Sequence, residues 1–292
     1  MFSIIIPTYN NLACLKICIK SIQKNSKYKH EIIVHVNEGK DGTINFLKKK
    51  KIPYSWTSKN VGLCKAVNLA AKKSKKNYIV YSHDDFYFCP YWDKYFFQEI
   101  KKINHNKFYL SGTMIDTFNG KKFFCGETPE KFNEEMLLQN YKKIKLEDFQ
   151  GSTWAPHVVH KEVWNRVGGF SEEFFPGAGS DPDFAMKLWN INNRIFKGLG
   201  KSLVYHFGSR TLRNNNNILK KKNLGSNSGK IFIKKWGISI KFFKKYYLHS
   251  GAKYISKLND PKKNFRFLFE YILCKVNFIY LQFFFKKLNI KS

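Results

Sequence analysis

Two adjacent acidic residues, Asp84 and Asp85, come one residue after an apolar run from Tyr78 to Ser82 that is typical of a buried strand, with His83 between. Carboxylates this close repel each other unless a positive charge lies between them. Mg²⁺ and Mn²⁺ bind carboxylate oxygens together with substrate phosphates, so the pair predicts a divalent-metal site. The alternative is a turn or a helix cap ahead of Pro90.

A second acidic pair, Asp181 and Asp183, flanks Pro182 at the predicted start of a helix from 183 to 190. One interpretation is structural, with Asp181 as the N-cap and Asp183 as a first-turn acid. The other is catalytic, because the glycine-rich stretch 176–179 could close over a substrate. A carboxylate at this place could then take a proton from an attacking hydroxyl. The two roles are compatible.

His206 follows the apolar run 203–205 and precedes Gly208, so we expect it at the end of a strand. A neutral imidazole there could complete a metal shell or contact a phosphate. An isolated histidine is as readily structural, but its place after two acidic pairs favours a role in a site.

The elements that must position these groups alternate between strands and helices. Apolar runs at 3–6, 31–36 and 78–82 are typical of buried parallel strands, and residues 12–22 and 60–73 have helical spacing. This alternation predicts an α/β fold, Rossmann-like, with a mostly parallel sheet and helices on both faces. Ligands bind beyond the carboxyl ends of the strands in such sheets.

The composition changes after the strand expected at 202–207. Residues 213–228 are rich in Asn, Lys and Ser, which is typical of a linker, and the rest is rich in Lys and aromatic residues. We therefore divide the chain into a domain at 1–212, a linker at 213–229 and a helical extension at 230–292. The extension either packs on the domain or lies on a membrane as an interfacial helix.

The chain of 292 residues carries a formal charge of +31, from 52 Lys and Arg against 21 Asp and Glu. Such a charge suits nucleic acid, an anionic membrane or phosphate-bearing substrates. The joint abundance of Lys, Asn, Ile, Phe and Tyr is also what an AT-rich coding sequence produces without selection for binding. The net charge alone therefore does not identify a binding partner.

Several motifs of other protein classes are absent from the sequence. There is no G-x-G-x-x-G fingerprint, no P-loop and no H-E-x-x-H, which disfavours dehydrogenases, P-loop kinases and zinc proteases. Six cysteines form no C-x-x-C pair, which fits a reduced, cytosolic setting. No stretch of about 20 apolar residues predicts a transmembrane helix.

The order of the motifs that are present makes the sequence resemble glycosyltransferase family 2, whose members are inverting enzymes with the GT-A fold. Residues 3–10 are similar to the family's first strand, and residues 31–43 to its second strand and Asp-Asp-Gly-Ser loop. Asn60-Val61-Gly62, with Asn68 downstream, is similar to its donor-binding N-x-G segment. His83-Asp84-Asp85 falls at its D-x-D motif, and residues 168–183 resemble the stretch that contains its catalytic E-D element.

The resemblance implies roles for individual residues. The implied metal ligands, for Mn²⁺ or Mg²⁺, are Asp85 and His206, and the implied catalytic residues are Asp181 and Asp183. The implied donor-binding residues are Pro7, Thr8, Tyr9, Asn37, Glu38, Asn60, Gly62, Asn68, His83 and Asp84.

The sequence departs from the family pattern at three places. His83 replaces the first Asp of D-x-D, Asn37-Glu38 replaces the acidic pair that contacts the base, and Ser180 stands where Glu is common. The last departure leaves Asp181 as the better candidate for the base.

The implied activity is that of a metal-dependent glycosyltransferase of the hexosyltransferase type. It would transfer a sugar, with inversion, from a nucleotide-diphosphate sugar to a hydroxyl of a glycan or lipid-linked glycan. Cell-surface polysaccharide or lipopolysaccharide-type glycan synthesis is the implied context. The implied location is cytoplasmic. The protein could also contact the inner face of an anionic membrane peripherally.

Three other classes remain open. The first is a catalytically impaired relative that binds the nucleotide-sugar, because of His83. The second is a basic nucleic-acid-binding protein, although no recognised motif supports specific binding of nucleic acid. The third is a GT-A nucleotidyltransferase, but Thr8 to Asn11 stand where such enzymes usually carry a glycine-rich basic loop.

Overall fold

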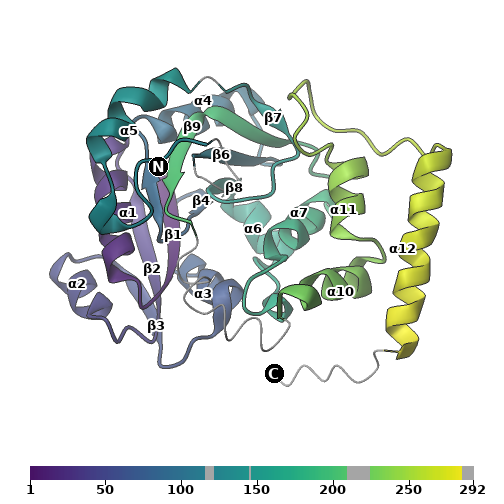
Figure 1. Ribbon diagram of the computed structural model, residues 1–292, viewed down its shortest axis with the longest axis horizontal. Coiled ribbons are helices and arrows are strands. Elements are labelled where there is room, and N and C mark those ends of the chain that lie inside the picture. Colours follow the sequence, from purple (N-terminus) through teal and green to yellow (C-terminus); the bar gives the residue numbers. More distant parts are fainter. Residues whose placement is uncertain (116–121, 145, 209–223, 285–292) are drawn as a thin grey trace.

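The computed structural model describes residues 1–115, 122–144, 146–208 and 224–284, and within them a single sheet of nine strands is the centre of the fold (Figure 1). The strand order is β3-β2-β1-β4-β8-β6-β9-β5, and β7 pairs with β9. The strands are β1 Phe2–Tyr9, β2 Glu31–Asn37, β3 Tyr54–Thr57, β4 Tyr78–Tyr81, β5 Phe86–Phe88, β6 Tyr109–Ile115, β7 Phe149–Gln150, β8 His157–His160 and β9 Phe196–His206.

The strand directions confirm the predicted, mostly parallel sheet. β1 runs parallel to β2 and β4, β2 to β3, and β6 to β9. β8 is antiparallel to both β4 and β6, and β5 and β7 are antiparallel to β9. Six of the described strands therefore point one way, and β5, β7 and β8 point the other way.

β1 is buried almost throughout, as a parallel strand covered on both faces must be. Pro7 lacks a backbone N–H, but it lies beyond the segment Phe2–Ile5 that pairs with β4. The proline is therefore tolerated near the end of a central strand.

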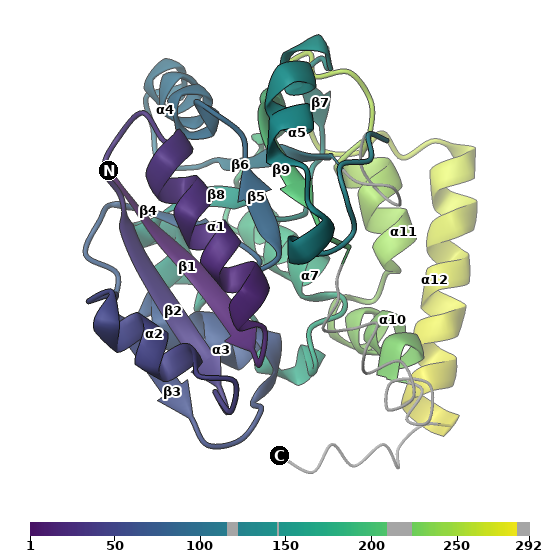
Figure 2. The same ribbon diagram turned by 60° about the vertical axis from the view of Figure 1, so that its left-hand side comes forward.

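Helices cover both faces of the sheet. In Figure 2, α1 lies in front of the sheet and α3 behind it, where α3 contacts β1 and β2. The predicted apolar face of α1 is confirmed at Leu15, Ile19 and Ile22, which are buried. The helices of this part are α1 Leu12–Asn25, α2 Thr43–Lys49, α3 Gly62–Ala71, α4 Trp92–Ile103, α5 Glu134–Asn140, α6 Lys161–Val167 and α7 Ser180–Asn190, with 3-10 turns at η1 Pro129–Lys131, η2 Tyr141–Lys143 and η3 Glu172–Phe174.

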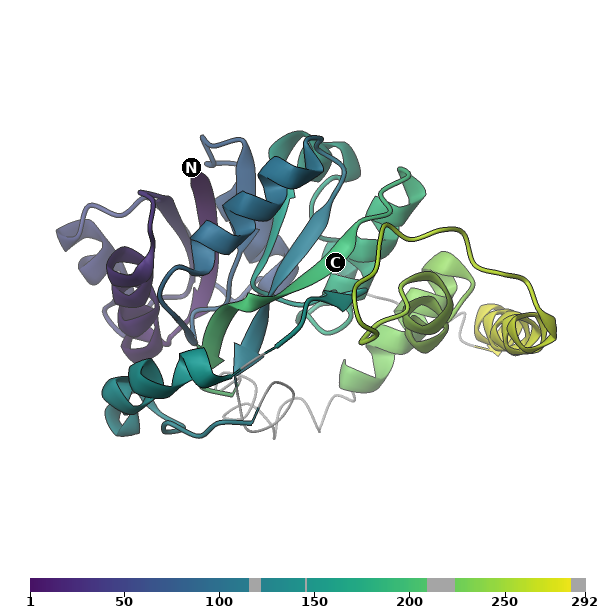
Figure 3. The same cartoon turned by 90° about the horizontal axis from the view of Figure 1, so that it is seen from above.

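The C-terminal extension is helical, as predicted, and lies at the side of the sheet away from β2 and β3 (Figures 1 and 3). The rings of Phe242 and Phe267 are 5.0 Å apart, and Lys245 Nζ lies 2.5 Å from Glu270 Oε1, so α12 packs on α10 and α11. Its elements are α10 Leu224–Trp236, α11 Ile240–Phe242, a π-helical turn Phe243–Tyr247 and α12 Phe265–Phe284. None of the helices in the described ranges has the length and apolar character needed to cross a membrane.

Some predicted boundaries differ from the structure. α7 begins at Ser180 rather than at 183, and its N-cap is Gly179, with a φ of 84°, so the capping role considered for Asp181 is wrong. Glycine takes this left-handed conformation without the steric cost that Asp would meet. α10 begins at Leu224, inside the stretch expected to be a linker, and residues 213–223 lie outside the described part.

The close packing of β7 on β9 generates a stability prediction. A Cβ on Gly198 would lie 1.9 Å from Cζ of Phe149, so Gly198→Ala should force apart two strands of the sheet. We expect a loss of about 1–3 kcal/mol in the free energy of unfolding, as is usual for overpacking, measured by urea denaturation.

Gly229→Ala is the matched control, because it lies in α10 and no atom is within 4 Å of its added Cβ. This variant should be neutral or gain up to about 1 kcal/mol from helix propensity. Equal unfolding midpoints for the Gly198→Ala protein and the unmodified protein would contradict the described packing.

Candidate active site

Asp85 and His206 are brought together by strand register. β4 ends at Tyr81, and the chain turns through residues 82–85 into β5. β5 pairs antiparallel with the end of β9, which sets Phe86 opposite His206. The backbone N–H of Phe207 donates to the carbonyl of Asp85 over 3.1 Å and closes the arrangement.

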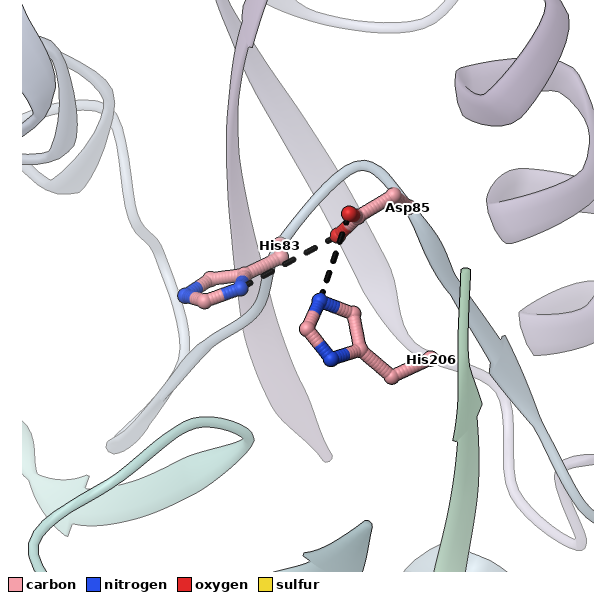
Figure 4. Close-up of side chains that lie close together, drawn as sticks. All are labelled: His83, Asp85 and His206. Carbon is pink, nitrogen blue, oxygen red and sulfur yellow. Dashed lines mark ion pairs between the residues drawn. The ribbon is translucent and has the colours of Figure 1, made fainter. Parts of the chain in front are cut away.

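His83, Asp85 and His206 form a compact group of ligand atoms (Figure 4). His206 Nε2 lies 3.3 Å from Asp85 Oδ2, and His83 Nδ1 lies 3.9 Å from Asp85 Oδ1. The ligand atoms of all three residues lie within 4.8 Å of one another. One carboxylate and two imidazoles suit Mn²⁺ and similar divalent transition metals, so these residues fit a bound cation.

His83 was expected among the donor-binding residues, and the structure places it in this group instead. Its ring stacks on Phe86, with centroids 4.7 Å apart. Burial lowers the pKa of His83 to about 4, even though the Asp85 carboxylate acts in the opposite direction. The imidazole is therefore neutral at pH 7 and has a nitrogen lone pair available for a metal.

Asp84 faces β1 rather than the two histidines. Its Oδ2 accepts a hydrogen bond of 2.6 Å from the Thr8 hydroxyl. Burial, and then the charge of the neighbouring Asp85, raise the pKa of the Asp84 carboxyl. A cation beside this acidic pair would relieve that cost, which agrees with the electrostatic argument from sequence.

Asn37 and Asn60 shape the loop that leads into α3. Asn37 Oδ1 accepts from the backbone N–H of Val61, and Asn60 Oδ1 accepts from that of Gly62, both over 2.9 Å. Gly62 has a φ of 79°, and a Cβ there would lie 2.6 Å from the Phe175 ring. The predicted donor-binding amides therefore build the loop, and its conformation requires glycine.

Tyr9 and Glu38 lie side by side at the ends of β1 and β2. The Tyr9 hydroxyl donates to Glu38 Oε1 over 3.4 Å, and Lys40 Nζ lies 3.1 Å from Glu38 Oε2. Trp56 on β3, which the sequence argument missed, donates from Nε1 to the Glu38 carbonyl over 2.7 Å and is half exposed. An exposed indole at this edge can stack on a planar base.

Asn68 has two backbone partners. Its Nδ2 donates to the Phe170 carbonyl over 2.8 Å, and its Oδ1 accepts from the Phe170 N–H over 2.9 Å. The side chain therefore attaches α3 to the segment between α6 and α7. Pro7 lies within β1, paired with His35 of β2. These contacts of Asn68 and Pro7 are made within the protein, and the donor-binding role of both residues stays a prediction.

Asp181 is the acidic residue of α7 that retains an unpaired oxygen. Its Oδ1 is buried and has no hydrogen-bond partner among the described residues. Burial raises the pKa of this carboxyl to about 7, and the charge of Lys244 opposes the shift. A carboxylate with this pKa can act as a general base near neutral pH.

Asp183 is fully buried, and its oxygens are engaged. Oδ2 accepts from the Ser171 hydroxyl over 2.6 Å, and Oδ1 accepts from Trp236 Nε1 over 2.8 Å and lies 3.0 Å from Lys235 Nζ. These contacts attach α7 to α10 of the extension. Asp183 is thus placed to position α7, and the catalytic role expected for it from the sequence stays a prediction.

Sequence reasoning missed Lys235 and Trp236, because one Lys-Trp pair among many Lys and aromatic residues carries no local signal. It also missed His157 on β8, whose Nδ1 lies 2.8 Å from the Tyr109 hydroxyl. Its Nε2 is buried without a hydrogen-bond partner in the described part of the chain. Each of these contacts joins segments that are far apart in the sequence.

A group of possible metal ligands at the edge of a Rossmann-like sheet is the geometry of the site, and comparison with known proteins identifies the family. Residues 3–165 match the profile of glycosyl transferase family 2, more than half of the chain, and the protein belongs to this family.

A chondroitin synthase of Pasteurella multocida (strain Pm70) is 23% identical over 235 residues, which cover 70% of this chain and 24% of that protein. The chain thus spans about a quarter of the length of this curated relative.

Solved structures of TarS from S. aureus share the fold. TarS 1–349 has a TM-score of 0.56 at 16% identity, over 96% of this chain and 80% of that one. TarS 1–349 in complex with UDP has a TM-score of 0.54 at 17% identity, over 70% of this chain and 59% of that one. Its complex with UDP-GlcNAc gives 0.52 at 16% identity, over 71% and 60%. The fold is GT-A.

The cluster generates a prediction about metal binding. Asp85→Ala removes the shared carboxylate, so we expect Mn²⁺ affinity to fall by at least about tenfold, as losses of metal-site groups commonly do. Electron paramagnetic resonance of free Mn²⁺ measures the affinity without any donor.

Asp260→Ala, which removes an exposed acid paired with Arg194, is the matched control and should leave the affinity unchanged. Equal Mn²⁺ affinities for the Asp85→Ala protein and the unmodified protein would show that the ion binds elsewhere.

Proposed function

We propose that this protein is an inverting, metal-dependent glycosyltransferase that moves a sugar from a nucleoside-diphosphate sugar to a hydroxyl. The observation that carries the proposal is the His83–Asp85–His206 group at the edge where β1 and β4 end. Family membership supports the reaction class, and a cation held by these three residues would bind the diphosphate of the donor.

His83, Asp85 and His206 would hold the cation. A divalent ion bound there supplies positive charge to the departing diphosphate. Asp84 accepts a hydrogen bond from Thr8 beside this group and would add negative charge near the bound cation. His83 does not by itself indicate an inactive relative, because its neutral ring offers a ligand nitrogen in place of the family's carboxylate.

We propose Asp181 as the general base of a single displacement. Its carboxylate takes the proton from the acceptor hydroxyl while that oxygen forms a bond to the anomeric carbon. The bond from this carbon to the diphosphate oxygen breaks, and the electron pair leaves with the diphosphate. Attack opposite to the leaving group inverts the configuration. The unpaired, buried Oδ1 supports this role.

We propose a uridine diphosphate sugar as the donor. TarS structures have been solved in complex with UDP and with UDP-GlcNAc, which supports the donor class. In this chain, Tyr9 and the exposed ring of Trp56 offer surfaces for the base beside Glu38. Thr8 and the loop shaped by Asn37 and Asn60 border the same strand ends.

For the acceptor we propose a glycan or lipid-linked glycan of cell-surface polysaccharide or lipopolysaccharide-type synthesis. The similarity to a chondroitin synthase supports a polysaccharide context. We also propose a catalytic unit at about 1–212 with the extension at 230–292, and a cytoplasmic location. All six cysteines are free and buried, which suits a reducing compartment.

Release of nucleoside diphosphate tests the proposed function. The full chain, incubated with Mn²⁺ and a panel of nucleotide sugars, should release the nucleoside diphosphate from at least one donor. Chelation of the metal ion should stop this release. If no donor is turned over and the protein instead binds oligonucleotides with steep salt dependence, the nucleic-acid alternative holds.

A prediction for Asp181 follows from its environment. Asp181→Asn should lower kcat by about 10²–10⁴-fold and retain donor binding, because the base is lost and the fold is kept. In the unmodified protein only the ionised carboxylate accepts the proton, so kcat should rise with pH through the pKa of about 7. The variant should lose this pH dependence.

Asp260→Asn, on the surface, is the control and should keep both the rate and the pH profile. Full transfer activity of the Asp181→Asn protein would remove Asp181 from the mechanism.

A further inference from the structure

One side of α12 is apolar and exposed along the whole helix, which lies at the outer edge of the molecule (Figure 1). Its exposed side chains recur every three or four residues, so they share one face. Each is 46–73% exposed. We call them the α12 outer face: Leu268, Phe269, Ile272, Val276, Ile279 and Phe283.

The opposite side of α12 attaches it to the protein. Phe267, Cys274 and Leu281 are each less than 8% exposed, and they are spaced by seven residues along the seam with α10 and α11. The helix is therefore apolar on both sides, but only the narrow inner seam is covered. Helices of this kind are normally buried, and a soluble surface rarely exposes such a continuous patch.

The charges beside the outer face discriminate between possible occupants. Residues 262–292 contain seven Lys and Arg and one acid, Glu270. Glu270 is paired with Lys245 and with Arg266. A second copy docked by two-fold symmetry would bring the same cations against each other, which opposes association. Anionic lipid headgroups carry the complementary charge.

We propose that the α12 outer face binds an anionic membrane surface, with the helix lying in the plane of the interface. The apolar side chains enter the boundary between headgroups and acyl chains, and the exposed Lys262, Lys263 and Arg266 contact lipid phosphates. Long basic side chains reach the headgroups while their stems stay on apolar surface.

This arrangement combines the two signals that peripheral binding requires, an apolar face and a basic rim. The inner seam keeps α12 attached to α10, which is itself bonded to α7 through Asp183. The bound membrane would therefore lie at a fixed side of the GT-A domain. The inference concerns binding alone and does not depend on the proposed catalytic activity.

Vesicle flotation of the full chain tests the proposal. One set of vesicles contains phosphatidylcholine alone, and the other contains phosphatidylcholine with phosphatidylglycerol. The protein should float with the anionic vesicles, and added salt should weaken this binding. The triple variant Phe269→Ser/Ile272→Ser/Ile279→Ser should float at least about tenfold less, because its apolar face is interrupted.

The matched control replaces three exposed apolar residues elsewhere, Ile255→Ser/Phe124→Ser/Met136→Ser, and should float like the unmodified protein. Circular dichroism checks that both variants are folded. Absence of flotation, equal flotation with both kinds of vesicle, or equal loss in both triple variants would overturn the proposal. A dimer in sedimentation velocity that only the α12 variant abolishes would also overturn it and assign the face to a second copy.

Discussion

The pairing of β5 with β9 is the constraint on which the site depends. It places Phe86 opposite His206 and so brings His206 to the carboxylate of Asp85, although the two residues are far apart in the chain. Without this register, Asp84 and Asp85 would be two buried acids, and His206 would not lie beside them as a further possible metal ligand. With it, one carboxylate and two imidazoles converge where the parallel strands end, and this group fits the cation proposed to bind the diphosphate.

The C-terminal extension contributes to the same site from outside the region that defines the family. Lys235 and Trp236 hold Asp183, and Asp183 holds the helix that carries Asp181. Removing one partner of a buried charge is costly, so the attachment of α10 to α7 is strongly maintained. The two acids of α7 therefore differ in their surroundings: Asp183 is engaged with α10, and Asp181 has a buried oxygen without a hydrogen-bond partner among the described residues, which is the oxygen proposed to accept the substrate proton.

Sequence predicted the parts of this fold that local patterns encode. Continuous apolar runs gave β1, β2 and β4, and helical spacing gave α1 and α3, because these elements are buried on defined faces. Asp85 and His206 were predicted as ligands from their places after strands. The antiparallel β8, the grouping of His83 with the metal ligands, and the partners of Asn68 and Asp183 were not predicted, since each depends on contacts between segments distant in sequence.

The most direct test of the central claim is a crystal structure of the protein with Mn²⁺ and a uridine diphosphate sugar, with the metal located by anomalous scattering. The account predicts a manganese ion coordinated by Asp85 and His206, with His83 as a further ligand, and the diphosphate on its open side. A manganese ion and a donor that both bind away from Asp85 would contradict it.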